Sequence, residues 1–212
     1  MASLPALPPH FDVQRDPITR PRLDERLKML EPDDAAVLET LRDFLAWDRQ
    51  PIDQTDEQVV ARYDALMPTV SNRLVRDLID DRMEVRTIVS GLRRRKAGLP
   101  SPVGIDPWAA HIRRNWEHPE FGLGGRHRWI ARFREFDEAG QVLDAARIQL
   151  SVAWNVWSRE AGRYHFTLEA VILYVARWDL IDRWTSRDAA RGRERFEQLI
   201  SQTLGDHGQL HD

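Results

Sequence analysis

The segment that most limits how this chain folds is residues 168–184, LEAVILYVARWDLIDRW, which reads as a helix with little polar surface. Thr167 is a favourable N-cap residue, and neither glycine nor proline interrupts the segment after it. Every side chain in residues 170–175 is apolar, so the apolar stripe there covers the whole circumference. Such a helix must be surrounded by other helices, and its apolar run is too short to cross a bilayer. We therefore expect it to be the central element of a bundle.

The remaining sequence shows helical periodicity and no sustained two-residue alternation, which predicts an all-α, multi-helix bundle. Thr55 and Gln58 have the spacing of a capping box, which marks the start of one helix. Ser186 is expected to cap a second, amphipathic helix that follows the central one and stops at Gly205. The other expected helices are residues 22–30, 33–46, 56–66, 68–97, 107–116, 126–136 and 141–160.

Proline and glycine suggest where the chain divides. A Pro-rich stretch at residues 99–105 is the expected hinge between two helical halves. Because residues 1–21 are also rich in proline, we expect them to lie extended over the surface. The predicted parts are an extended N-terminal segment (1–21), an N-terminal helical half (22–98), the hinge (99–105), a C-terminal helical half (106–205) and a tail (206–212).

The net charge of −3 conceals a basic middle between two acidic ends. Residues 82–134 contain 12 basic and 4 acidic side chains, whereas residues 1–81 contain 10 and 17, and residues 135–212 contain 9 and 13. Such a basic segment either pairs with acidic neighbours inside the fold or forms a partner-binding face. Indoles beside arginines would be plausible anchors for a partner. The candidate partner-binding residues are Arg93, Arg94, Arg95, Lys96, Arg113, Arg114, Arg126, Arg128, Trp108 and Trp116.

Motifs for catalysis and for cofactor binding are missing from the sequence. It contains no GxxxxGK[ST] loop, no HExxH and no cysteine, and the glycines at 122–125 do not fit the dinucleotide pattern. His111 and His118 lie near two glutamates, but ordinary surface positions are the favoured interpretation. Asp80 and Asp81 are adjacent on a helix, so they diverge too far to act as an acid/base pair. We expect no catalytic residues, no cofactor and no metal site.

A set of short motifs in the C-terminal half carries a family resemblance. Its members are Phe166-Thr167-Leu168-Glu169, Leu180-Ile181-Asp182-Arg183-Trp184, Ser186, Asp188, Gly192 and Phe196. Phe121-Gly122-Leu123 and Ala2-Ser3-Leu4-Pro5 look like two further marks. In this order and spacing, the pattern resembles an uncharacterised bacterial family encoded in V-type ATPase operons, whose members are taken to be the counterpart of the C subunit of that ATPase.

The resemblance implies a non-catalytic subunit of a bacterial V/A-type rotary ATPase that links the central stalk to the membrane rotor ring. The expected partners are therefore stalk and ring subunits, with no small-molecule substrate, and with membrane contact only through those partners. The expected location is cytoplasmic, peripheral to the inner membrane. An alternative function is a helical nucleic-acid-binding or regulatory adaptor that uses the basic middle segment on phosphates. The net negative charge and the lack of a recognition-helix motif make nucleic acid the less favoured partner.

Overall fold

The computed structural model describes residues 4–46, 49–51 and 54–207, with side chains up to residue 187. This part of the chain is all-α and contains no strand, which confirms the predicted fold class. A single turn of 3₁₀-helix, η2 (Met67–Thr69), lies between the third and fourth helices. The α-helices are α1 (Arg20–Leu27), α2 (Pro32–Leu45), α3 (Asp56–Leu66), α4 (Arg73–Lys96), α5 (Trp108–Arg114), α6 (Trp129–Glu138), α7 (Val142–Ala161) and α8 (Leu168–His207).

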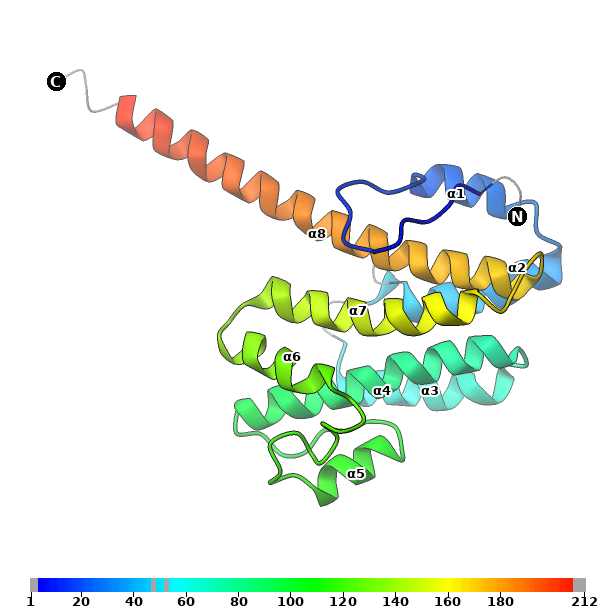
Figure 1. Ribbon diagram of the computed structural model, residues 1–212, viewed down its shortest axis with the longest axis horizontal. Coiled ribbons are helices and arrows are strands. Elements are labelled where there is room, and N and C mark those ends of the chain that lie inside the picture. Colours follow the sequence, from blue (N-terminus) through cyan, green and yellow to red (C-terminus); the bar gives the residue numbers. More distant parts are fainter. Residues whose placement is uncertain (1–3, 47–48, 52–53, 208–212) are drawn as a thin grey trace.

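The first half of α8 is the central helix that the sequence predicts (Figure 1). It packs mainly against α7, and also against α2. All of residues 170–176 are buried, and Ile172, Leu173 and Ile181 are fully inaccessible to water. Neighbouring helices therefore cover the apolar surface of this segment on more than one side, as expected. Within the described residues, no helix is both long enough and apolar enough to cross a membrane.

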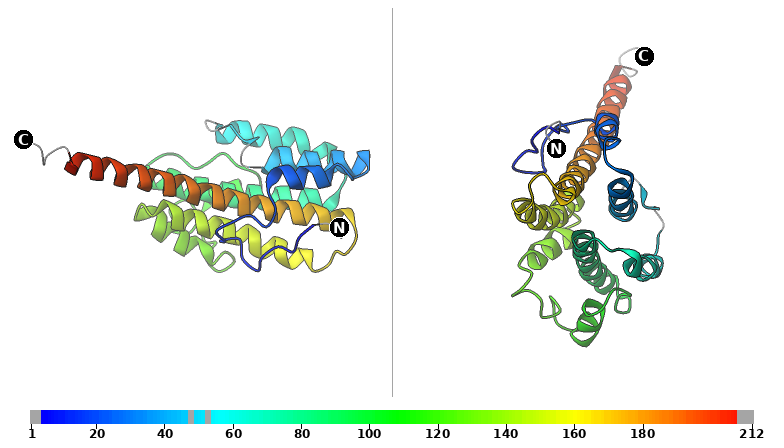
Figure 2. Two further views of the ribbon diagram at one scale, coloured as in Figure 1. Left: turned by 90° about the horizontal axis from the view of Figure 1, so that it is seen from above. Right: turned by 90° about the vertical axis from the view of Figure 1, so that its right-hand side faces the viewer.

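The sequence prediction of two helices in residues 168–205 is wrong, because α8 is one continuous helix of 40 residues. Ser186 lies in its interior and does not start a new helix, and Gly205 does not end it. The side chain of Thr185, one residue earlier, bonds back to the carbonyl of Ile181 at 3.1 Å, as hydroxyls inside helices often do. Beyond this point the helix leaves the bundle and extends past the other elements (Figures 1 and 2).

The start of α4 also differs from the prediction, which had one helix over residues 68–97. Pro68 lies in η2, and α4 begins only at Arg73. The reason is a local cap: Oδ1 of Asn72 accepts a hydrogen bond from the backbone N–H of Val75 at 3.1 Å. At the start of α3, the capping box formed by Thr55 and Gln58 is present as predicted.

Buried side chains form two apolar clusters, and α4 contributes to both. The larger cluster joins α2 and the first half of α4 to α7 and α8, so both expected halves of the chain contribute to it. The smaller cluster joins the second half of α4 to α5, α6 and the segment between them. Gly91 permits this second contact, because a Cβ there would lie 3.2 Å from the Phe121 ring. The division of the chain into two domains stays a prediction.

The segment before α1 crosses α7 and α8 without forming a helix. Two buried or partly buried indoles hold it by hydrogen bonds to its carbonyl groups. Nε1 of Trp154 donates to the oxygen of Pro9 at 3.2 Å, and Nε1 of Trp178 donates to the oxygen of Ile18 at 2.8 Å. Because Phe11 and Ile18 are buried, this segment is part of the packed structure.

Candidate interaction surface and two polar cavities

The basic run at residues 93–96 lies on the last turn of α4 and contacts α6. Nε of Arg93 lies 3.2 Å from Oδ1 of Asp137, and Nζ of Lys96 lies 3.3 Å from Oδ2 of the same carboxylate. Cations at a helix C-terminus also interact favourably with the helix dipole. These two side chains therefore have a structural role, although about half of each remains exposed.

The two central arginines of this run bind backbone carbonyl groups. Nε of Arg94 donates to the oxygen of Pro100 at 2.8 Å. Arg95 donates to the oxygen of Trp116 at 3.3 Å, and its guanidinium lies 4.7 Å from the centre of the Phe121 ring. Arg94 thus holds the segment that follows α4, and Arg95 joins the end of α4 to the segment after α5. All four basic residues at 93–96 thus have partners within the fold, which leaves fewer free cations for a ligand.

The basic residues after α4 are different, because they are exposed. Arg113 and Arg114 lie at the end of α5, and Arg128 precedes α6. None of these three makes an ion pair or a side-chain hydrogen bond among the described residues. Arg126 is also exposed, and its guanidinium lies 5.0 Å from the centre of the Trp108 ring, in cation–π geometry. These four arginines are the available part of the predicted partner-binding set.

Both candidate indoles are partly buried and packed against other rings. Trp116 stacks on Phe121 with a centroid separation of 5.5 Å and an angle of 9° between ring planes. Trp108 meets the His127 ring edge-on at 5.4 Å and packs against both apolar clusters. Each indole therefore stabilises the fold and keeps one part of its surface exposed.

His111 and His118 do not form a metal site in the described structure. Nε2 of His111 lies 2.8 Å from the carbonyl oxygen of Phe121, and Nδ1 of His118 accepts a hydrogen bond from the N–H of Gly122 at 3.0 Å. Both histidines thus organise the loop between α5 and α6. Residues 4–46, 49–51 and 54–187 contain no group of three or more side chains of the types that hold metals.

A cavity of about 340 Å³ lies between α4, α7 and the residues just before α6. Asp81 and Glu84 enter it from α4, His127 from the segment before α6, and Trp129 from the first position of α6. Nε2 of His127 and the indole nitrogen of Trp129 are buried and have no hydrogen-bond partner among the described residues. This concentration of polar groups was not predicted from the sequence.

Burial changes the ionisation of the acidic groups in this cavity. It raises the pKa of Glu84 to about 7, against an attraction to Arg126 that lowers it. Burial and the neighbouring charge of Asp77 raise the pKa of Asp81 to about 6. Burial also lowers the pKa of His127, because removal from water disfavours the charged imidazolium. Near neutral pH the imidazole of His127 is therefore neutral, Glu84 is partly protonated, and Asp81 is still mostly ionised.

The neighbouring carboxylates of Asp80 and Asp81 point to different surroundings. Asp80 accepts a hydrogen bond from the hydroxyl of Tyr63 on α3 at 2.6 Å, whereas Asp81 lines the cavity against α7. The two adjacent carboxylates thus lie in different surroundings.

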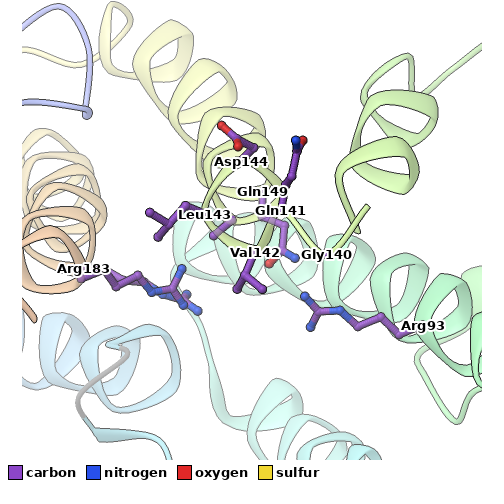
Figure 3. Close-up of a pocket in the computed structure, with 10 residues that line it drawn as sticks. Arg93, Gly140, Gln141, Val142, Leu143, Asp144, Gln149 and Arg183 are labelled. Atoms are coloured by element: carbon purple, nitrogen blue, oxygen red, sulfur yellow. The ribbon is translucent and has the colours of Figure 1, made fainter. Parts of the chain in front are cut away.

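A second and larger cavity, of about 770 Å³, lies between the end of α4, the first turns of α7 and the middle of α8 (Figure 3). Three arginines line it: Arg93 from α4, and Arg183 and Arg187 from α8. Of these, only Arg93 is among the binding residues predicted from the sequence. The other two lie one turn apart on α8, which places them on the same side of that helix.

These features define an all-α protein with an exposed group of arginines and two polar cavities. The chain belongs to the family described as "Protein of unknown function (DUF2764)", whose model matches residues 10–206. Neither the curated proteins nor the solved structures contain a match to it.

Proposed function

We propose that this chain is a non-catalytic subunit of a bacterial V/A-type rotary ATPase, similar to the C subunit, which links the central stalk to the membrane rotor ring. The observation that carries this proposal is the form of α8. Most residues of the C-terminal motifs that resemble the ATPase-operon family lie in this helix, whose first half is anchored in the core. Its second half extends beyond the bundle (Figure 1). A helix held in this way can transmit force from one bound partner to another.

The exposed arginines give the proposal a second support. Arg113, Arg114 and Arg128 have no partners among the described side chains, so they are available to acidic surfaces of a stalk or ring. The partly buried indoles Trp108 and Trp116 lie in the same part of the chain, and their exposed parts would supply apolar contact area. The proposed function needs binding surfaces and no chemistry at a catalytic centre.

The proposal is tested by capture of purified partners on the immobilised full-length chain. The partners are the stalk subassembly and the detergent-solubilised ring of a bacterial V/A-type ATPase, each offered alone at low and at moderate salt. We expect retention of at least one of them, with weaker retention at moderate salt. Failure to retain either one under both conditions would contradict the proposal.

A further inference from the structure

The arginine-lined cavity is built from three elements that are far apart in the sequence. Figure 3 shows the side chains of Arg93 and Arg183 extending from opposite sides toward the space beside the first turn of α7. Arg187 completes the basic lining, one turn beyond Arg183 on α8. The cavity thus places three guanidinium groups around one volume.

The described acidic side chains do not balance this charge. Arg93 is paired with Asp137, but no described side chain forms an ion pair with Arg183 or Arg187. Asp144 lines the cavity, yet Figure 3 shows its carboxylate directed away from both Arg93 and Arg183. In addition, Nε of Arg183 is buried and has no hydrogen-bond partner among the described atoms. A buried donor of this kind is costly unless another group accepts a hydrogen bond from it.

The ionisation of the arginines reflects the same imbalance. Burial, together with the neighbouring cations Arg82 and Arg187, lowers the pKa of the Arg183 guanidinium to about 9, against a weaker attraction to Asp179. Burial and the charge of Arg93 lower the pKa of Arg187 in the same direction. Arg82, on the adjacent part of α4, has its pKa lowered to about 10, chiefly by burial. An anion among these groups would favour their charged forms and so offset both burial and the repulsion between the cations.

The start of α7 lies at the rim of this cavity. Gly140, Gln141 and Val142 line it, and the side chain of Gln141 makes no capping hydrogen bond. The positive end of the helix dipole and the N–H groups of the first turn therefore face a region that already attracts anions. This feature adds to the attraction of the arginines.

We propose that this cavity binds a small molecule that carries one or more phosphate groups, with Arg93, Arg183 and Arg187 as the phosphate ligands. Guanidinium groups form paired hydrogen bonds with phosphate oxygens, and three of them match a multiply charged group. The volume of about 770 Å³ exceeds that of a single phosphate and lies in the usual range for small-molecule sites. The rest of the ligand would contact Leu143, Ala146 and the amide of Gln149. This binding site is independent of the proposed ATPase role.

The test uses inorganic phosphate, pyrophosphate and tripolyphosphate as probes of the full-length chain, with sodium chloride at matched ionic strength as the reference. Thermal unfolding and titration calorimetry report binding. Pyrophosphate or tripolyphosphate at ten times its Kd should raise the midpoint of unfolding by about 3–6 °C above the reference. The absence of any shift beyond that of sodium chloride for all three probes would overturn the proposal.

Variants separate specific binding from general attraction. The double substitution Arg183→Gln and Arg187→Gln should weaken probe binding at least tenfold. Arg113→Gln with Arg114→Gln removes the same charge from an exposed site and should leave the affinity within twofold of the parent. If the α8 double variant does not fold, Arg93→Gln at the exposed rim replaces it and should weaken binding at least fivefold. Equal losses in the site variant and the control would overturn the proposal.

An acidic peptide tests the competing source of negative charge. A ten-residue polyglutamate should compete with pyrophosphate only weakly, because its carboxylates cannot all enter the cavity. If the peptide binds through Arg183 and Arg187 and pyrophosphate does not, the cavity takes carboxylates of a protein partner and the phosphate proposal is wrong.

Discussion

Nε2 of His127 and Oε1 of Glu84 lie 3.3 Å apart in the cavity between α4 and α7, without the geometry of a hydrogen bond. Both side chains are largely buried, with 12% and 22% of their surface exposed. Burial favours the neutral form of each, since it raises the pKa of Glu84 and lowers the pKa of His127. Through these two side chains, the free energy of unfolding therefore depends on pH.

The substitution Glu84→Gln tests this dependence. The pKa of Glu84 is about 7 in the native state, against 4.5 for the ordinary carboxyl group. The native state thus holds a proton that the unfolded chain releases, so Glu84 makes the parent less stable as the pH rises from 4.5 to about 7. Above this range, the variant should be more stable than the parent by roughly 1–3 kcal/mol, and the difference should shrink toward pH 4.5.

Urea unfolding at several pH values measures this difference. Glu138→Gln is a suitable control, because that carboxylate is 59% exposed and lies outside the cavity. A constant difference between Glu84→Gln and the parent across the range would show that Glu84 does not bind its proton more tightly in the native state.

The substitution Ile172→Asp tests the central position of α8. Ile172 is fully buried among the helices of the larger core, so an aspartate there would be a buried charge without a partner. We expect a loss of roughly 3–5 kcal/mol in the free energy of unfolding, enough to unfold many domains. Met29→Asp, at a position that is 70% exposed, should change the stability by less than about 0.5 kcal/mol. Equal stability of the two variants would place α8 outside the core.

The substitution Ser186→Ala distinguishes one continuous helix from two. In the interior of α8, alanine has the higher helix propensity, so the variant should be as stable as the parent or more stable by roughly 0.5 kcal/mol. At an N-cap, the same change would cost about 1 kcal/mol. Thr55→Ala, which removes a capping box at the start of α3, supplies that cost as an internal standard. A loss in Ser186→Ala equal to that of Thr55→Ala would contradict the continuity of α8.

The exposed arginines at the end of α5 allow a test of the binding surface. Reversing both charges, Arg113→Glu with Arg114→Glu, should leave the fold intact, since exposed charges contribute little to stability. The association rate with the ATPase stalk or ring should fall about tenfold or more at low salt and should depend less on salt. Surface plasmon resonance at two salt concentrations measures both effects.

A matched control for this variant is Arg73→Glu with Arg163→Glu. These two side chains are 95% and 72% exposed and lie far from α5 in the sequence, and the net charge changes by the same amount. An equal decrease in rate for both double variants would assign the effect to net charge, and an unchanged rate for the α5 variant would exclude Arg113 and Arg114 from the interface.

The sequence predicted most of the helices because apolar spacing and caps are local signals. The capping box at Thr55 and the all-round apolar run of 170–175 both identify their elements correctly. The continuity of α8 was missed because serine is acceptable both at an N-cap and inside a helix. Once the first half of α8 is fixed in the core, each added residue extends an existing helix at little cost. A local pattern does not contain that information.

The two cavities were missed for a different reason. Arg93 and Arg183 line one cavity, and Glu84 lies beside His127 in the other, only after the helices have packed. The two residues of each pair are far apart in the chain. The basic run at 93–96 differs from these residues, because the sequence already identified it as a feature. The sequence left two roles open for this run, internal pairing or a partner-binding face. Consecutive helix positions point in different directions, and the four side chains contact different neighbours within the fold.

The most direct test of the proposed role is the composition of the native enzyme. A V/A-type ATPase is affinity-purified through a catalytic subunit from bacterial membranes that also contain this chain, and quantitative mass spectrometry then gives the molar ratio of the chain to the stalk subunits. A subunit that links stalk and ring should be present in a fixed ratio of about one copy per stalk, and should remain through gel filtration at moderate salt. Its absence from an otherwise complete and active enzyme would contradict the central claim.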